Sequence, residues 1–429
     1  MKFLLTLALF TLTAFYAYAQ TTAVVSPPAA DTREIRIKTF EKVWNTVNDN
    51  HYDPTFGGVD WKKVRETYYP KAMAAVSARE FHGILGQMLG ELKLSHFSIL
   101  PSAAAIAAAQ NGRGVIGIEL KMLDGEPVIN RVDKDSAADK AGLKPGFSVS
   151  KIDGKGWGEL TKELDVSLTA RKVTDGTRKI YFERTIEGII NGKPGTTLNL
   201  EVLDADNQPK QFSIVRAVFA GEMSQAMGNF PPQEVVFESK MLPNNIGYIR
   251  FNMWIIPQMP KLRKAIREFA EARAIVFDLR GNPGGVGGMA PGIAGLLADK
   301  KSSLGTMTMR SGPMEFIVYP QENPFNGKVV ILDDHGSGST SEVFAAGMQE
   351  SKRAIVVGTT SAGAVLPSVF EKLPTGAIFQ YAISDYRSPK NILIEGRGVI
   401  PDIEVKQTRT ALLKGQDAQL DAAVNLILK

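Results

Sequence analysis

The strongest constraint on the fold is an alternation of apolar runs and helical segments that begins at Glu234. Residues 274–279 form a nearly continuous apolar run, typical of a strand buried on both faces of a sheet. Three further runs repeat this pattern, at 329–333, 354–358 and 378–383. Because residues 341–350 have helical spacing between two of these runs, we predict a layered α/β domain at 234–429.

Two smaller units precede this domain. Between 34 and 94, apolar residues recur at three- and four-residue steps, as in Phe40, Val43 and Val47, which predicts a helical domain at 32–100. Between 105 and 218, short alternating runs separated by turn residues predict a compact β-rich domain. The predicted fold class is therefore α/β and multidomain.

Composition excludes several kinds of chemistry. The 429 residues contain no cysteine, which rules out disulfides, a thiolate nucleophile, cysteine-ligated zinc and iron–sulfur clusters. The formal charge of +5 is spread without a basic run, so no nucleic-acid partner is predicted. Imidazole chemistry is limited to four histidines, at His51, His82, His96 and His335.

The first 19 residues are typical of a signal peptide. Lys2 is followed by an apolar stretch over 3–16, and 17–19 offer small residues at a cleavage position before Gln20. The apolar stretch is too short for a membrane span, so we predict no stable membrane insertion after cleavage. We expect an exported protein, periplasmic or extracellular.

Ser339 is the first candidate for chemistry. The apolar run 329–333 leads into a turn rich in glycine and serine, and a helix follows it, so backbone N–H groups at Ser339 would favour a developing negative charge. Ser339 and Glu342 also have the spacing of a capping box, in which the hydroxyl only satisfies a helix amide. This stretch alone leaves both interpretations open.

A glycine-rich turn at 280–288 is the second candidate. Glycines allow backbone amides to approach a ligand closely, as an oxyanion hole or a phosphate cradle. The turn lacks the ending of a P-loop and the spacing of a dinucleotide motif, which disfavours phosphate. A turn that only needs positive φ would explain one or two of these glycines.

Two histidines compete for the role of general base. His96 follows Ser95 at the end of the predicted helical domain, and His335 lies four residues before Ser339. His51 and His82 are interpreted as structural residues, as most isolated histidines are.

The chain resembles a known family at four ordered motifs, which lie at 279–285, 338–342 with 354–358, and 395–402, with further likeness at 59–61 and 95–96. These resemble the C-terminal processing (tail-specific) proteases and the tricorn core proteases, a family of serine peptidases. The resemblance covers nearly all of the chain after the signal segment. It implies a crotonase/ClpP-like α/β catalytic domain and no metal or organic cofactor.

The β-rich region is similar to a PDZ domain. Its loop at 114–118 resembles a carboxylate-binding loop, and 141–146 resembles the characteristic PDZ turn. In such a loop, successive backbone amides bind a peptide's terminal carboxylate, and the peptide adds a strand to the sheet edge. The residues implied are Val115, Ile116, Gly117 and Ile118.

The sequence departs from the processing proteases at one position. Where the resemblance implies the lysine of a Ser-Lys dyad, the chain has Ala364. Ser95, His96 and Glu395 of this chain resemble the serine, histidine and glutamate of the tricorn-type branch. The resemblance then implies the following roles: Ser339 as nucleophile, His96 as base, Glu395 and Ser95 orienting the imidazole, and an oxyanion hole from the amides of Gly284 or Gly285 and Thr340.

We therefore predict an exported serine endopeptidase that acts on polypeptides, with the PDZ-like domain recruiting or gating substrate through C-termini. The alternative is a catalytically inactive protein of the same fold that binds peptides or lipids. The absence of the dyad lysine is the feature that keeps this alternative open.

Overall fold

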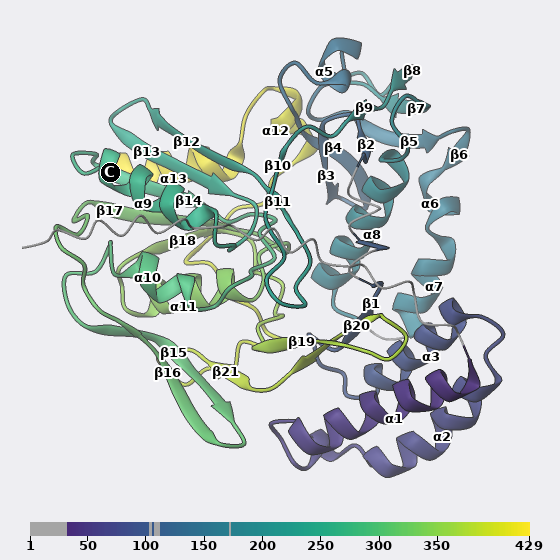
Figure 1. Ribbon diagram of the computed structural model, residues 1–429. Coiled ribbons are helices and arrows are strands. Elements are labelled where there is room, and N and C mark those ends of the chain that lie inside the picture. The colour runs from purple at the N-terminus through teal and green to yellow at the C-terminus, as the bar shows by residue number, and fades with distance from the viewer. Residues whose placement is uncertain (1–31, 103–104, 107–111, 171–172) are drawn as a thin grey trace, which may run out of the picture.

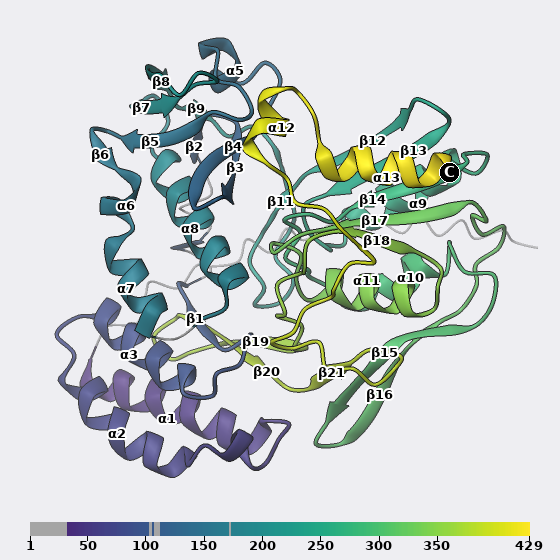
Figure 2. The same cartoon turned by 180° about the vertical axis from the view of Figure 1, so that it is seen from behind.

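A computed structural model describes residues 32–102, 105–106, 112–170 and 173–429. The predicted signal segment and most of the connector that precedes the β-rich region lie outside the described residues. Three regions follow one another along the chain, and Figures 1 and 2 show them from opposite sides. No helix within the described residues combines the length and apolarity needed to cross a bilayer.

The N-terminal region is helical, as the apolar spacing predicts. Its helices are α1 (Arg33–Asn50), α2 (Trp61–Ala74) and α3 (Ala78–Gly90). Each begins at a residue whose side chain accepts a hydrogen bond from the first turn, namely Thr32, Asp60 and Ser77. Phe40, Val43, Phe81 and Leu85 are among the fully buried residues of its core.

The middle region is built on an antiparallel sheet with the strand order β3-β4-β5-β7-β8. These strands are β3 (Ile118–Leu123), β4 (Glu126–Val132), β5 (Ser148–Ile152), β7 (Thr197–Leu203) and β8 (Pro209–Val215), with β6 (Lys155–Gly156) paired to β5. Helices α5 (Ala137–Ala141), α6 (Trp157–Leu160), α7 (Lys162–Ala170) and α8 (Asp175–Ile190) complete the region. A short ladder joins β2 (Gly114–Val115) to β9 (Ala217–Val218). Helix α8 packs along β3, which is the last strand of the sheet on that side.

The C-terminal region is the predicted α/β layer. Its sheet has the order β12-β13-β14-β17-β18-β22 and is parallel except for β12. The strands are β12 (Phe237–Leu242), β13 (Ile246–Phe251), β14 (Ala274–Asp278), β17 (Lys328–Asp333), β18 (Ile355–Gly358) and β22 (Ile403–Glu404). Helices α9 (Gln258–Glu268), α10 (Met289–Ala294) and α11 (Thr340–Glu350) lie on one side, and α13 (Ala418–Leu428) lies on the other (Figure 2).

Strand β14 shows why its sequence is apolar throughout. Ile275 and Phe277 belong to the core beneath α9 to α11, whereas Ala274 and Val276 belong to the core beneath α13. Successive side chains of a strand point to opposite faces, so a strand covered on both sides needs an unbroken apolar run.

One predicted strand lies in a different place. The sequence predicts the run 378–383 as a strand buried on both faces within the α/β layer, but β20 (Ile378–Ala382) instead pairs antiparallel with β1 (Ser98–Leu100) and β19 (Ser368–Lys372). Phe379 and Tyr381 pack into the core of the N-terminal helices. An apolar run predicts that a strand is buried, but it does not predict which part of the protein the strand packs against.

Short strands and a long hairpin complete the fold. The hairpin β15 (Ser302–Met309) and β16 (Gly312–Val318) pairs with β21 (Asp385–Arg387) and extends away from the sheet (Figure 1). Arg310 in its turn donates hydrogen bonds to the backbone carbonyls of Asn48, Asp49 and His51. The remaining elements are β10 (Glu222–Met223), β11 (Glu234–Val235), α12 (Arg409–Leu413) and the short helix η1 (Phe56–Gly58).

Candidate active site

Ser339 lies at the turn between β17 and α11. It is the residue before the first turn of α11, and its backbone has φ 53° and ψ −117°. Positive φ in a residue with a Cβ costs roughly 1–3 kcal/mol and persists only where the surroundings impose it. Ser339 remains partly exposed, so its hydroxyl can be reached by a substrate.

Glu342 holds this turn in place from within the protein. Its fully buried carboxylate accepts hydrogen bonds from the amide of Ser339 at 3.0 Å and from the amides of Gly363 and Ala364 at 2.7 and 3.0 Å, and from the hydroxyl of Ser361. Burial raises the pKa of Glu342 to about 7, against the effect of these hydrogen bonds. The sequence spacing predicts the contact between Ser339 and Glu342. It does not predict that Glu342 also binds Ser361, Gly363 and Ala364.

The structure forms the capping box that the spacing of Ser339 and Glu342 predicts. Glu342 accepts from the Ser339 amide, as the box requires. The Ser339 hydroxyl is placed toward the first turn in a capping-box arrangement, yet it makes no capping hydrogen bond of ordinary geometry. The geometry is therefore compatible with both interpretations of Ser339, as a helix cap and as a nucleophile.

The glycine-rich turn lies directly against the nucleophile candidate. A Cβ on Gly284, whose φ is +98°, would stand 2.5 Å from the Cβ of Ser339 and 2.8 Å from the amide nitrogen of Thr340. The Gly284 amide donates to Asn282 Oδ1 at 3.0 Å. Among the described residues, no hydrogen-bond acceptor is found for the backbone amides of Gly285 and Thr340. Of the amides predicted to stabilise an oxyanion, these two are the ones left to donate.

His96 lies at the end of a hydrogen-bonded relay. Its Nδ1 is 2.7 Å from Ser95 Oγ, and that hydroxyl donates to Glu395 Oε2 at 2.9 Å. Glu395 also accepts from the amide of Ser95 at 2.7 Å and from that of Val365 at 3.0 Å. When Ser95 donates to Glu395, its oxygen accepts from Nδ1–H, and the Nε2 of His96 is left as the proton acceptor.

Burial changes the acidity of both ends of the relay. His96 keeps some solvent exposure, but the surrounding protein lowers its pKa to about 4, which keeps the ring neutral at pH 7. Burial raises the pKa of Glu395, while the hydrogen bonds from Val365 and Ser95 act in the opposite direction. His96 itself has φ 60°, a further residue that the surroundings hold in the left-handed region.

Residues 364 and 365 connect the relay to the turn that carries Ser339. The carbonyl of Ala364 accepts from the amide of Ser339 at 2.8 Å, and the next amide, that of Val365, donates to Glu395. Ala364 thus lies beside Ser339, and its methyl side chain cannot act as a general base. Within the described residues, no hydrogen bond joins the Ser339 hydroxyl to His96; such contacts often tighten only when substrate is bound.

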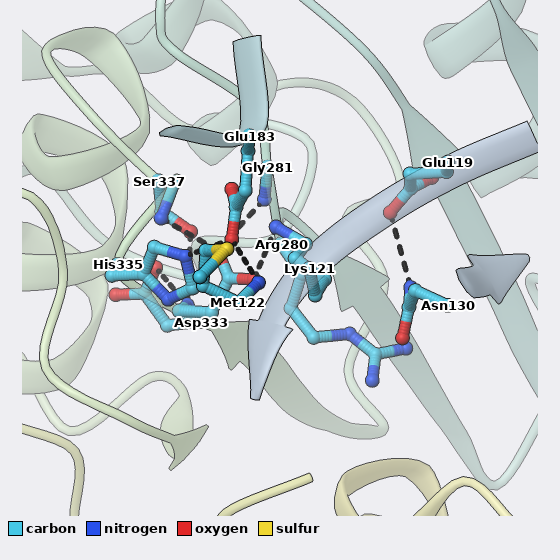
Figure 3. Close-up of polar contacts among 12 residues, drawn as sticks. Glu119, Lys121, Met122, Asn130, Glu183, Arg280, Gly281, Asp333, His335 and Ser337 are labelled. Carbon is cyan, nitrogen blue, oxygen red and sulfur yellow. Dashed lines mark hydrogen bonds and ion pairs between the residues drawn. The ribbon is translucent and has the colours of Figure 1, made fainter. Parts of the chain in front are cut away.

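His335 points away from this arrangement. Its Nε2 is 2.8 Å from Glu183 Oε1 of α8 (Figure 3). The neighbouring Asp334 forms a buried ion pair with Lys121 of β3 at 2.7 Å. A cavity of about 1040 Å³ lies between the middle region and the C-terminal region, and its lining includes Lys121, His335 and Arg397. The cavity does not include Ser339. The turn therefore contacts the middle region through His335 and presents Ser339 elsewhere.

The loop predicted to bind a carboxylate has an unusual backbone. Gly117 has φ 83°, and a Cβ there would lie 2.4 Å from the Cβ of Ser136. The carbonyls of Ile116 and Gly117 accept from the amides of Ala138 and Asp133. Val115 pairs with Ala217, and Ile118 opens β3.

The described residues contain no group of three or more histidine, aspartate or glutamate side chains arranged to hold a metal ion. The groups gathered around Ser339 and His96 are a serine hydroxyl, an imidazole and backbone amides. A serine at a strained strand-to-helix turn, facing a glycine-rich turn, is the arrangement of an acyl-transfer hydrolase.

Comparisons with known proteins identify the family. Residues 245–405 match Peptidase family S41, and residues 33–90 match the tricorn protease C1 domain. A carboxyl-terminal-processing protease of Synechocystis is 24% identical over 397 residues, covering 90% of this chain and 85% of the relative. The carboxy-terminal processing protease CtpA of Bacillus subtilis is 26% identical over 305 residues, covering 71% of this chain and 58% of the relative.

Solved structures show the same fold. The photosystem II D1 C-terminal processing protease has a TM-score of 0.54 at 20% identity, covering 86% of this chain and 92% of that structure. Mature CPAF has a TM-score of 0.63 at 13% identity, with coverages of 92% and 96%. Residues 245–405 therefore form a peptidase family S41 domain, and the chain is a serine-type peptidase that is similar to the C-terminal processing proteases.

Proposed function

We propose that the chain is an exported serine endopeptidase in which Ser339 is the nucleophile and His96 the general base. The observation that carries this proposal is the relay from Glu395 through Ser95 to His96, tied to the Ser339 turn by Ala364 and Val365. A Ser-Lys dyad has no support, because Ala364 occupies the position of the implied lysine.

In the proposed reaction, Ser339 Oγ attacks a peptide carbonyl and its proton passes to His96 Nε2. The imidazolium keeps Nδ1–H on Ser95 Oγ, and the carboxylate of Glu395 stabilises the positive charge through the Ser95 hydroxyl. The amides of Gly285 and Thr340 donate to the oxyanion of the tetrahedral intermediate.

The second half of the reaction uses the same groups. His96 gives its proton to the leaving amine, which departs and leaves an acyl ester on Ser339. His96 then takes a proton from water, the hydroxide attacks the ester, and the returned proton releases Ser339 and the new carboxyl end of the substrate. The low pKa of His96 keeps it a neutral base at pH 7 and makes its protonated form a strong acid.

The proposed substrates are unfolded polypeptides, presented through their C-termini. We assign this recruitment to the predicted PDZ-like domain at 105–218, with the backbone of Val115, Ile116, Gly117 and Ile118 facing the terminal carboxylate. The relatives named as carboxyl-terminal processing proteases support this substrate class.

The test uses purified protein that lacks residues 1–19 and an unfolded, fluorescently labelled polypeptide. Ser339→Ala should abolish cleavage, and His96→Ala should slow it on the order of 10²- to 10⁴-fold. Ser351→Ala and His82→Ala are the matched controls and should cleave normally, because the Ser351 hydroxyl bonds the Met348 carbonyl and His82 contacts Thr375, both away from Ser339 and His96. Full activity of His96→Ala would show that the base is wrongly assigned, and peptide binding without any cleavage would favour the inactive binding protein.

Export is tested separately. N-terminal sequencing of the protein recovered from outside the cytoplasm should begin at Gln20. A protein that retains Met1 and stays with the cytoplasmic fraction would contradict the proposal.

A further inference from the structure

Strand β3 is the edge of the middle sheet, and two of its amides are already occupied by carboxylates. The strand has β4 on one side only. On the other side, the amide of Met122 donates to Glu183 Oε1 at 2.8 Å, and the amide of Leu120 donates to Glu187 Oε1 at 3.0 Å. Both glutamates belong to α8.

The spacing of the two contacts matches that of a β ladder. Leu120 and Met122 are two residues apart, so their amides point to the same side of β3, about 6.6 Å apart along the strand. Glu183 and Glu187 are four residues apart on one face of α8, which is about 6 Å along the helix. The two carboxylates therefore stand where the carbonyl oxygens of an added strand would accept hydrogen bonds.

We propose that Glu183 and Glu187 are an internal competitor for peptide, occupying the edge of β3 until a polypeptide C-terminus displaces them. This inference rests on the proposed recruitment of C-termini by the PDZ-like domain and adds how that groove is held closed. The occupant that fits is an extended C-terminal tail, because it replaces the two carboxylates with backbone carbonyls and brings its own carboxylate toward the loop at Ile116 and Gly117.

The closed groove is also connected to the nucleophile turn. The Oε1 atom that accepts from Met122 lies 2.8 Å from Nε2 of His335, four residues before Ser339 (Figure 3). Glu183 is buried, with 7% of its surface exposed. A tail that takes the amide of Met122 therefore removes Glu183 from its place beside His335, so occupation of the groove changes contacts of the turn that carries Ser339.

The experiment measures binding of a fluorescein-labelled decapeptide with an apolar last residue and a free C-terminal carboxylate, by fluorescence anisotropy. All proteins carry Ser339→Ala, so that no peptide is cleaved. The double variant Glu183→Ala/Glu187→Ala should bind the peptide at least tenfold more tightly than the parent. Glu163→Ala removes an exposed glutamate from α7 and is the matched control, expected to bind as the parent does.

A second variant separates occupation of the amide from loss of packing. Glu187→Gln keeps an acceptor oxygen for Leu120 and should bind within about twofold of the parent, whereas Glu187→Ala should bind more tightly. Equal affinity of the parent and the double variant, or tighter binding by Glu187→Gln than by Glu187→Ala, would overturn the internal competitor. If neither the parent nor any variant binds the free-acid peptide better than its C-terminally amidated form, the proposed recruitment of C-termini fails as well.

Discussion

Replacing Ser95 with alanine removes one group from the middle of the proposed relay. The hydroxyl of Ser95 is 2.7 Å from His96 Nδ1 and 2.9 Å from Glu395 Oε2, so both links are lost while His96 and Glu395 remain. The amide of Ser95 still donates to Glu395, which keeps the backbone in place. Ser95→Ala therefore probes how the imidazole is oriented and polarised, without removing the base.

The expected magnitude follows from the charge that develops on His96. A hydrogen bond to a charged group contributes about 1.5–3 kcal/mol, and the imidazolium exists only after Ser339 has lost its proton. The loss should therefore fall on kcat/KM by roughly 10- to 150-fold. Removing the base itself should cost more, on the order of 10²- to 10⁴-fold.

The assay is the steady-state kcat/KM for a fluorogenic polypeptide at pH 7.5. Ser95→Thr retains a hydroxyl and should recover much of the activity that Ser95→Ala loses. Ser98→Ala is the matched control, because that hydroxyl bonds Gln380 and lies outside the relay. Wild-type activity in Ser95→Ala, or a loss as large as that of His96→Ala, would refute the relay.

Four further predictions concern pH and the turn that carries Ser339. Because the base must be neutral, and burial lowers the pKa of His96 to about 4, kcat/KM should rise with pH through about 4 and not through 6.5; an acid limb near 6.5 that persists in Glu342→Gln would contradict this. The same shift should make the contribution of His96 to the unfolding free energy rise with pH between about 4 and 6.5, since the unfolded chain binds the additional proton in that range; the measurement is the difference between the wild type and His96→Gln in denaturant unfolding, in which the opposite contribution of Glu342, whose pKa burial raises to about 7, cancels. Gly284→Ala should abolish cleavage and lower stability by about 1–3 kcal/mol in denaturant unfolding, because its Cβ would lie 2.5 Å from the Ser339 Cβ; normal activity would show that the two turns are not in contact. Glu342→Ala should lower stability by roughly 3 kcal/mol in the same assay, because it leaves buried amides without an acceptor, and an unchanged unfolding midpoint would contradict this role of Glu342.

Local pattern was sufficient for the elements that carry Ser339. The apolar run at β17, the glycine- and serine-rich turn and the helical spacing of α11 are all contiguous, so periodicity and turn chemistry define them. The same reasoning misplaced β20, because its apolar run is explained equally well by burial within the α/β layer or by packing against the N-terminal helices.

The relay could not be derived from local pattern. Ser95 and Glu395 are 300 residues apart in sequence, and nothing in the spacing of either predicts their contact. Only the resemblance to a known family predicts that Ser95 and Glu395 act at the same site. Glu183 and Glu187 had no signal of function either, because two glutamates four residues apart are ordinary on an exposed helix. Their contact with β3 depends on which face of α8 meets the sheet edge.

The central claim is that Ser339 is a nucleophile activated by His96. The most direct measurement is the rate of labelling by a fluorophosphonate probe, with the modified residue located by mass spectrometry. We predict an adduct on Ser339, formed at least 100-fold more slowly in His96→Ala and at the normal rate in His82→Ala. Labelling of Ser339 at the same rate in His96→Ala, or no labelling of Ser339 in the wild-type protein, would contradict the claim.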